Sequence, residues 1–244
     1  MVHESSPSIL FALDHLAALA VSVAAAITVV RLARRGPVEA SRVRKVLAVL
    51  LPLMILAWPI EEILRGQQAV WAILPLDLCT FNLVVSTLAL FAPRQRLFEC
   101  MFFWSLGAFL AMVTPPITQQ FPHPRFIAFF ALHALLVCSW AFLVAGVRMQ
   151  LERRSWLRVW LTTNLLAVPV GVIDVLFDRN YFFLRGKPDG GPTMLDLFGE
   201  WPMYLIVADL LMGALFYLMQ LTWTWRTSAA ASGPDRDDPE PVGA

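Results

Sequence analysis

The amino-acid sequence predicts an all-α membrane protein, with seven transmembrane helices bundled into one domain over residues 1–226. The composition is the first indication, because 58% of the 244 residues are hydrophobic and only 15% are charged. A soluble domain carries roughly a quarter charged residues, and the mean hydropathy here is +0.65. The second indication is a series of seven apolar segments near the roughly 20 residues that a helix needs to cross a bilayer. They lie at about 9–30, 46–64, 71–91, 97–113, 126–146, 156–177 and 201–225.

The first apolar segment has the charge order of a spanning helix. A signal peptide has basic residues before its apolar stretch, whereas Glu4 precedes this one and Arg31 and Arg34 follow it. Among the later segments, the one at 97–113 is the shortest, and Pro169 interrupts the sixth.

Two regions outside the segments have a different composition. The long loop at 178–200 contains a short amphipathic stretch around Met194 and Leu197. This stretch is compatible with a lid at the membrane interface and equally with a plain surface loop. The tail at 227–244 is rich in Ala, Pro and Asp without apolar periodicity, which predicts a disordered cytoplasmic tail.

Basic residues predict how the bundle is oriented. Cytoplasmic connections carry an excess of Lys and Arg. Here the connections on one side, with the C-terminal tail, hold fourteen Lys and Arg, and the other side holds five. We therefore expect a protein of the cell membrane with its N-terminus outside and its C-terminus in the cytoplasm. Removing one helix would put basic connections on opposite sides, so the same pattern supports seven.

Charge, lysine and cysteine content exclude several classes of protein. The net charge is +1, without the dense basic patch that nucleic-acid binding requires. The three cysteines lie in apolar segments and form no CxxC pattern. Lys45 and Lys187 are the only lysines, and neither is in a predicted helix, which excludes a retinal Schiff base. We expect no cofactor and no resident metal, and membrane lipids as partners.

Ionisable and thiol side chains gather in the outer halves of the predicted helices. Such residues cost a few kcal/mol inside a membrane and usually face the bundle interior. Their distribution predicts a shared cavity open to the outer leaflet. Alternatively, those at the helix ends are interfacial and the others form separate helix–helix hydrogen bonds. The residues are Asp14, His15, Glu61, Glu62, Asp77, Cys79, His133, Asp174 and Asp209.

Cys79 and His133 form the most reactive combination among these residues. At 1.5 Å per residue, Cys79 lies roughly 12 Å below the start of its predicted helix and His133 roughly 10 Å below the start of its own, so they can share one level. A Cys–His pair performs nucleophilic catalysis when the imidazole takes the thiol proton and the thiolate attacks a carbonyl. Either residue alone is more often structural.

The neighbours of this pair have open roles. On a regular helix Asp77 points about 200° away from Cys79. Asn82 shares the Cys79 face, where it can stabilise an oxyanion or form an interhelical hydrogen bond. An apolar stripe that includes Phe126 and Phe130 shares the face of His133. Such a stripe is typical of packing and also suits an acyl chain.

Several short strings of residues are distinctive in their order and spacing along the chain. They are His15, Leu74-Pro75-Leu76-Asp77-Leu78-Cys79, Phe129-Phe130-Ala131-Leu132-His133, Asn180-Tyr181-Phe182-Phe183-Leu184, Lys187-Pro188 and Trp201-Pro202-Met203-Tyr204. Together they resemble the YwaF and transmembrane protein 164 family of integral membrane proteins, from about residue 10 to 225. The family commonly has His where this chain has Asp77.

The resemblance implies a phospholipid acyltransferase or a related lipid-acyl hydrolase, because the animal member is regarded as remodelling phospholipids with a Cys and a His. Carried over by motif, Cys79 is the nucleophile and His133 the base. Nine further residues are candidates for supporting catalysis or binding substrate. They are His15, Glu61, Asp77, Asn82, Asn180, Tyr181, Trp201, Tyr204 and Asp209.

Other functions stay open on the sequence. A proton- or cation-coupled transporter or channel would be lined by Asp14, Asp77, Asp174 and Asp209, although polar residues mostly stop before the inner half. A metal-dependent membrane hydrolase is also compatible, since two intramembrane histidines exclude a three-His zinc site but allow a His-His-Asp one. A sensor or receptor is a further alternative.

Overall fold

The computed structural model describes residues 12–64, 76–188 and 193–231, and every regular element within these ranges is helical. Its seven α-helices confirm the all-α prediction. A short π-helix continues α5, and two 3-10 helices lie between α6 and α7. The bounds are α1 Leu13–Ala33, α2 Pro37–Leu64, α3 Leu78–Phe91, α4 Gln95–Val113, α5 Pro124–Ala141, η2 Phe142–Gly146, α6 Ser155–Phe177, η3 Tyr181–Phe183, η4 Met194–Phe198 and α7 Met203–Ala231.

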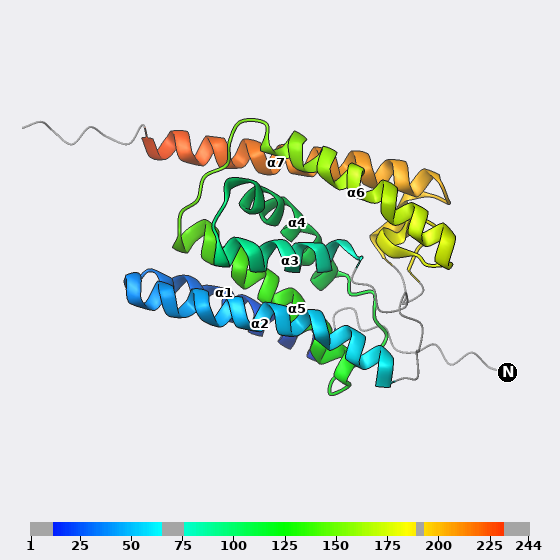
Figure 1. Ribbon diagram of the computed structural model, residues 1–244, viewed down its shortest axis with the longest axis horizontal. Helices are drawn as coiled ribbons and strands as arrows, with labels where there is room; N and C mark the ends of the chain where they lie inside the picture. Colours follow the sequence, from blue (N-terminus) through cyan, green and yellow to red (C-terminus); the bar gives the residue numbers. More distant parts are fainter. Residues whose placement is uncertain (1–11, 65–75, 189–192, 232–244) are drawn as a thin grey trace, which may run out of the picture.

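The helices lie side by side in a bundle. Figure 1 shows α1 and α2 along one edge, α6 and α7 along the opposite edge, and α3, α4 and α5 between them. The central helices contact both edges, because α5 packs against α1 and α2 while α4 packs against α6. The connections at 34–36, 92–94 and 147–154 share one end of the bundle with the C-terminal end of α7 (Figure 1). We call this the basic end, because its connections carry Arg34, Arg35, Arg94, Arg148, Arg153 and Arg154.

Five of the described helices are long and apolar enough to cross a membrane. They are α1, α4, α6, α5 together with η2, and residues Met203–Arg226 of α7. α3 is apolar but has only 14 residues, and α2 carries charged residues in its first turns. The chain therefore has the architecture of a multi-pass helical membrane protein.

Two predicted helix boundaries differ from the structure for local reasons. α2 begins at Pro37 rather than near residue 46, because proline suits the first helical position and Glu39 suits the first turn. α7 continues to Ala231, so the predicted disordered tail does not begin at residue 227. The last helical residues include three alanines, and alanine has the highest helix propensity. The rest of that tail, 232–244, lies outside the described residues.

Aromatic side chains on α4 join the central helices to α7. The ring of Phe102 lies with its centroid 6.0 Å from that of Trp140 on α5 and 5.3 Å from that of Trp223 on α7. Phe103 lies 5.1 Å from Phe216 on α7. These rings are part of the larger buried cluster of the molecule, and they connect α4 to α7, which also packs against α6.

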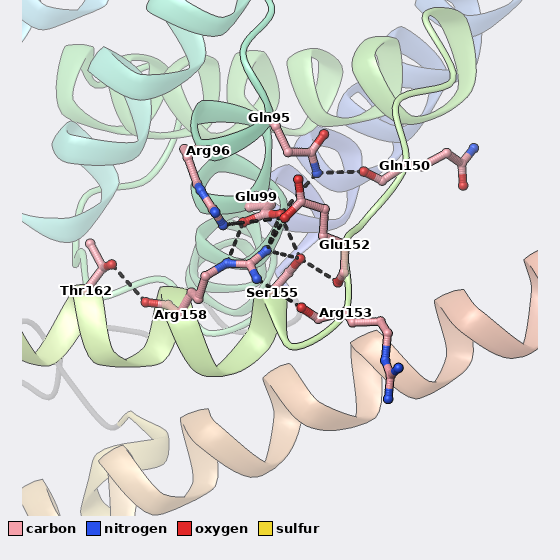
Figure 2. Close-up of polar contacts among 9 residues, drawn as sticks. All are labelled: Gln95, Arg96, Glu99, Gln150, Glu152, Arg153, Ser155, Arg158 and Thr162. Atoms are coloured by element: carbon pink, nitrogen blue, oxygen red, sulfur yellow. Dashed lines mark hydrogen bonds and ion pairs between the residues drawn. The ribbon is translucent and has the colours of Figure 1, made fainter.

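The carboxylate of Glu99 is the centre of a polar network at the basic end (Figure 2). Its side chain is 1% exposed. Arg158 on α6 donates from Nη2 to Oε1 over 2.6 Å, and Ser155 donates from Oγ to the same atom over 2.8 Å. From α4 itself, Gln95 donates over 3.0 Å and Arg96 over 3.1 Å. The network therefore pairs a buried charge completely and ties α4 to the start of α6.

We expect Glu99→Ala to destabilise the protein by ~3 kcal/mol. Removing one partner of a buried ion pair costs about 3–5 kcal/mol, and the lower end applies because the Arg158 side chain is 34% exposed. Thermal unfolding of the protein purified in detergent measures the loss.

Glu152→Ala is the matched control, because Glu152 contacts the same Arg158 over 3.0 Å while its own side chain is 51% exposed. An exposed pair contributes about 0–1 kcal/mol, so this variant should unfold near the wild-type temperature. Equal losses in the two variants would contradict the central role of Glu99.

Candidate functional site

Cys79 lies in the first turn of α3, at the end of the bundle opposite the basic end. Asp77 is the N-cap of α3, with an extended backbone at φ −72° and ψ 150°, and its carbonyl accepts hydrogen bonds from Thr80 and Phe81. The prediction that Cys79 lies some 12 Å along a helix starting near residue 71 is therefore wrong. Asp is among the residues favoured at an N-cap, so the helix begins only after Asp77. The predicted start at 71–75 lies outside the described residues.

On a regular helix Asp77 would point about 200° away from Cys79. Asp77 instead precedes the helix, so this expected orientation does not apply. The residue is exposed. The backbone N–H of Phe182 donates to its carboxylate, and the negative charge of Asp174 acts on it. The charge of Asp77 also acts on the nearby Cys79. Asp77, Asp174 and Cys79 are thus members of one polar neighbourhood.

The segment at 178–186 covers this neighbourhood from the α6 side. The ring of Phe182 meets that of Phe81 on α3 edge to face, at a centroid distance of 5.9 Å. Phe182 and Phe183 have left-handed backbones with φ of 55° and 57°, which is rare for bulky residues and costs about 1–3 kcal/mol each. Surrounding contacts must hold the segment in this shape.

Hydrogen bonds inside the segment supply part of that support. Asp174, fully buried, accepts from the backbone N–H of Tyr181 over 2.9 Å. The side-chain oxygen of Asn180 accepts from the N–H groups of Arg185 and Gly186 over 2.9 and 3.1 Å. Both Asn180 and Tyr181, which the family strings singled out, therefore shape this segment.

Two residues at the start of α7 supply the other contacts that hold the segment at 178–186. Trp201 donates from its indole to the carbonyl of Leu184 over 3.0 Å, and the buried Tyr204 donates from its hydroxyl to the carbonyl of Phe183. The amphipathic stretch that was predicted as a lid or a surface loop forms η4, whose Leu197 is 81% exposed. It packs on α7 rather than on the neighbourhood of Cys79.

His133 lies in the interior of α5 and is 6% exposed. Its Nδ1 is 2.7 Å from the carbonyl oxygen of Phe129. A carbonyl can only accept, so Nδ1 carries the proton and the neutral ring keeps Nε2 as an acceptor. The ring of Phe129 lies 4.2 Å away and fixes the ring plane. This is the protonation state that a general base requires.

α3 and α5 are neighbours in the bundle, but the described residues contain no hydrogen bond between the Cys79 thiol and the His133 imidazole. The catalytic pair therefore stays a prediction. Catalytic hydrogen bonds are often long in proteins without substrate and shorten in the complex.

His15 and Asn82 form contacts elsewhere between helices. His15 is fully buried, and its Nε2 lies 2.8 Å from the carbonyl oxygen of Met112 at the end of α4. Asn82 donates to Ser105 of α4 and accepts from Ser86, both over 3.4 Å. Of its two predicted roles, the interhelical hydrogen bond is therefore the one that it fills.

Asp209 and Asp14 also have local partners. Asp209 accepts from Trp160 and Asn164 of α6, both over 3.0 Å, and so joins α6 to α7. Asp14 accepts from the backbone N–H of Phe121 over 3.0 Å. The side chain of Glu61 lies outside the described residues. The predicted polar set thus divides into several contacts among the described residues, and Asp77, Cys79 and Asp174 form one neighbourhood within it.

The apolar stripe of His133 is a packing surface. Phe126, Phe130 and Val137 are buried in a second cluster with Met112 and Ile117. In the described ranges, no group of three or more His, Cys, Asp or Glu side chains is placed to hold a metal ion. The two buried histidines, His15 and His133, instead face backbone carbonyls of different helices.

The sequence identified Asp174 only as an outer polar residue and as a candidate for lining a transport path, and Phe182 only as part of a family string. In the structure Asp174 organises the segment at 178–186. The sequence does contain a signal for this role. Asp174 lies near the end of its helix and seven residues before Tyr181, so its carboxylate can accept a hydrogen bond from the backbone of the loop that follows.

Comparison with known proteins gives one match. The model of the TMEM164 family matches residues 6–220. No curated protein and no solved structure matches the chain.

We expect Tyr204→Phe to open the segment at 178–186. The change removes the hydroxyl that donates to Phe183 and leaves that carbonyl without its donor, at a cost of about 1 kcal/mol. Local opening should then rise about fivefold, since 1.4 kcal/mol corresponds to a tenfold change. Limited trypsin cleavage after Arg179 and Arg185 measures the opening.

Tyr217→Phe on the same helix is the control. Tyr217 is 45% exposed and contacts Trp156 through its ring, so its cleavage pattern should match the wild type. An unchanged cleavage rate in Tyr204→Phe would show that the anchor at Phe183 does not hold the segment.

Proposed function

The chain belongs to the TMEM164 family, and on that premise we propose that it is a multi-pass protein of the cell membrane that transfers or hydrolyses lipid acyl chains through Cys79 and His133. The proposal places the basic end in the cytoplasm and the N-terminus outside, in accord with the positive-inside rule. Membrane phospholipids are then the partners, and they reach Cys79 from the outer leaflet.

The observation that carries the proposal is the hydrogen bond from His133 Nδ1 to the carbonyl of Phe129. It selects the tautomer whose Nε2 takes a proton, on a helix that packs against the one carrying the thiol. The family commonly has His at the position of Asp77, so this chain lacks an imidazole there. The proposal therefore assigns the role of base to His133 alone.

The chemistry balances without a cofactor. His133 Nε2 takes the thiol proton of Cys79, and the thiolate attacks the ester carbonyl of a phospholipid. The ester C–O bond breaks, the leaving alkoxide oxygen takes the proton from the imidazolium and leaves as a hydroxyl, and the acyl chain stays on Cys79 as a thioester. A lysophospholipid hydroxyl or water then attacks the thioester, with His133 again accepting the proton, and the thiol is restored.

The segment at 178–186 has a supporting part in this proposal. It packs on the first turns of α3 through Phe182 and Phe81 and is anchored to α7 by Trp201 and Tyr204. A cover of this kind would keep bulk water from the thioester while an acyl chain approaches between helices. The transporter alternative has less support, because Asp14 and Asp209 are engaged in separate contacts.

Acylation of the thiol is the decisive test. Purified protein in detergent is incubated with a phospholipid that carries a radiolabelled acyl chain, and the label that hydroxylamine releases from the protein is counted. We expect the wild type to be labelled and Cys79→Ala to be unlabelled. His133→Gln should be labelled about 10²–10⁴-fold more slowly, the usual contribution of a general base.

Cys138→Ala is the matched control, since Cys138 is a buried thiol on α5 that packs in the apolar core. It should be labelled like the wild type. Label that persists in Cys79→Ala, or disappears in Cys138→Ala, would refute the assignment of the nucleophile.

A further inference from the structure

A hollow lies between α1 and α5 near the basic end. Its volume is about 330 Å³, within the roughly 300–1,000 Å³ that small-molecule sites occupy. Four of its lining residues are apolar and two are arginines. They are Ala26, Ile27, Val30, Arg31, Arg34 and Ala141.

Small residues leave this space open. Ala26 on α1 and Ala141 at the end of α5 both line it, and neither has a side chain long enough to close it. Next to the hollow, a Cβ atom on Gly146 would lie 3.0 Å from the Cβ of Ala33. The glycine thus lets the end of α1 approach η2 closely, while the space beside them stays unfilled.

The two arginines at this hollow have unsatisfied charge. Arg34 donates from Nε to the carbonyl of Ala145 over 3.4 Å, which holds its guanidinium beside the end of α5 and leaves both Nη groups available. Across the described ranges, neither Arg31 nor Arg34 has a carboxylate partner. The nearest acidic residue along the chain, Glu39, is paired with Arg42.

The surroundings indicate what fills the hollow. α1 is long and apolar enough to span a membrane, and on it Val23 is 58% exposed and Ile27 is 45% exposed. Such a surface faces lipid rather than water. The apolar lining therefore lies at acyl-chain depth. Arg31 in the last turn of α1 and Arg34 at its C-cap lie at the level of the headgroups. Basic pockets between helices on the cytoplasmic side favour anionic lipid headgroups.

We propose that this hollow binds an anionic phospholipid of the leaflet at the basic end. One acyl chain lies along Ala26, Ile27 and Val30, and the phosphate is held by the guanidinium groups of Arg31 and Arg34. The site is separate from Cys79, which lies at the opposite end of the bundle. It does not depend on acyl transfer.

Native mass spectrometry of the full chain in mild detergent tests the proposal. The protein is titrated with dioleoyl-phosphatidylglycerol and separately with dioleoyl-phosphatidylcholine, which differ only in the headgroup. We expect the anionic lipid to bind at least tenfold more tightly. In Arg31→Gln/Arg34→Gln its affinity should fall about 25-fold, since each arginine near a membrane surface contributes about fivefold.

Further variants distinguish lipid binding in the hollow from a general attraction of anionic lipid to surface charge. Arg35→Gln/Lys45→Gln removes two exposed charges from the same region outside the hollow, and should lower the affinity less than threefold. Ala26→Phe fills the apolar part while both guanidinium groups remain, and should weaken binding as strongly as the arginine pair. Ala26→Leu is a milder filling that should give an intermediate loss if Ala26→Phe unfolds.

Thermal unfolding without added lipid checks that each variant is folded. The proposal is overturned if the two lipids bind equally, if the control pair loses as much affinity as Arg31→Gln/Arg34→Gln, or if filling the apolar part with either substitution leaves binding unchanged.

Discussion

The pairing of Glu99 is the interaction on which the basic end of the bundle depends. A carboxylate that is 1% exposed is costly in an apolar interior unless its charge and lone pairs are satisfied. Arg158 and Ser155 on α6 meet this requirement together with Gln95 and Arg96 on α4. One charge therefore determines how α6 starts relative to α4, and the α6–α7 pair follows, because Asp209 of α7 is bonded to Asn164 of α6.

The opposite end depends on a second carboxylate with weaker pairing. Asp174 is fully buried and binds the N–H of Tyr181, but its second side-chain oxygen has no hydrogen-bond partner in the described structure. Beside it, Phe182 and Phe183 adopt left-handed backbones that Trp201 and Tyr204 hold in place. Incomplete pairing and an unfavourable backbone are features of functional sites more than of scaffold, and here both lie next to Cys79.

These two ends suit different tasks within one bundle. The basic end has a paired charge, aromatic contacts from α4 to α7 and a small hollow beside α1. The opposite end holds the thiol, two nearby carboxylates and a covering segment. The paired charge of Glu99 and the left-handed backbone of Phe182 and Phe183 thus lie at opposite ends of the bundle.

The sequence by itself determined the helices, because apolar length and charged connections are local properties that survive any packing. It predicted seven helices, and the spans of α4 and α6 within two residues. It also identified Asn180, Tyr181, Trp201 and Tyr204 as a related set.

Only the tertiary structure decided what these residues do, because a hydrogen-bond partner is chosen by contacts between distant segments. Asn82 bonds to Ser105, His15 to Met112 and Asp209 to Asn164, since a polar group inside the bundle bonds the partner that the packing of neighbouring helices places beside it. The tertiary structure likewise decided that α3 starts at Leu78. In it Asp77 is an N-cap whose carboxylate faces Phe182 and Asp174.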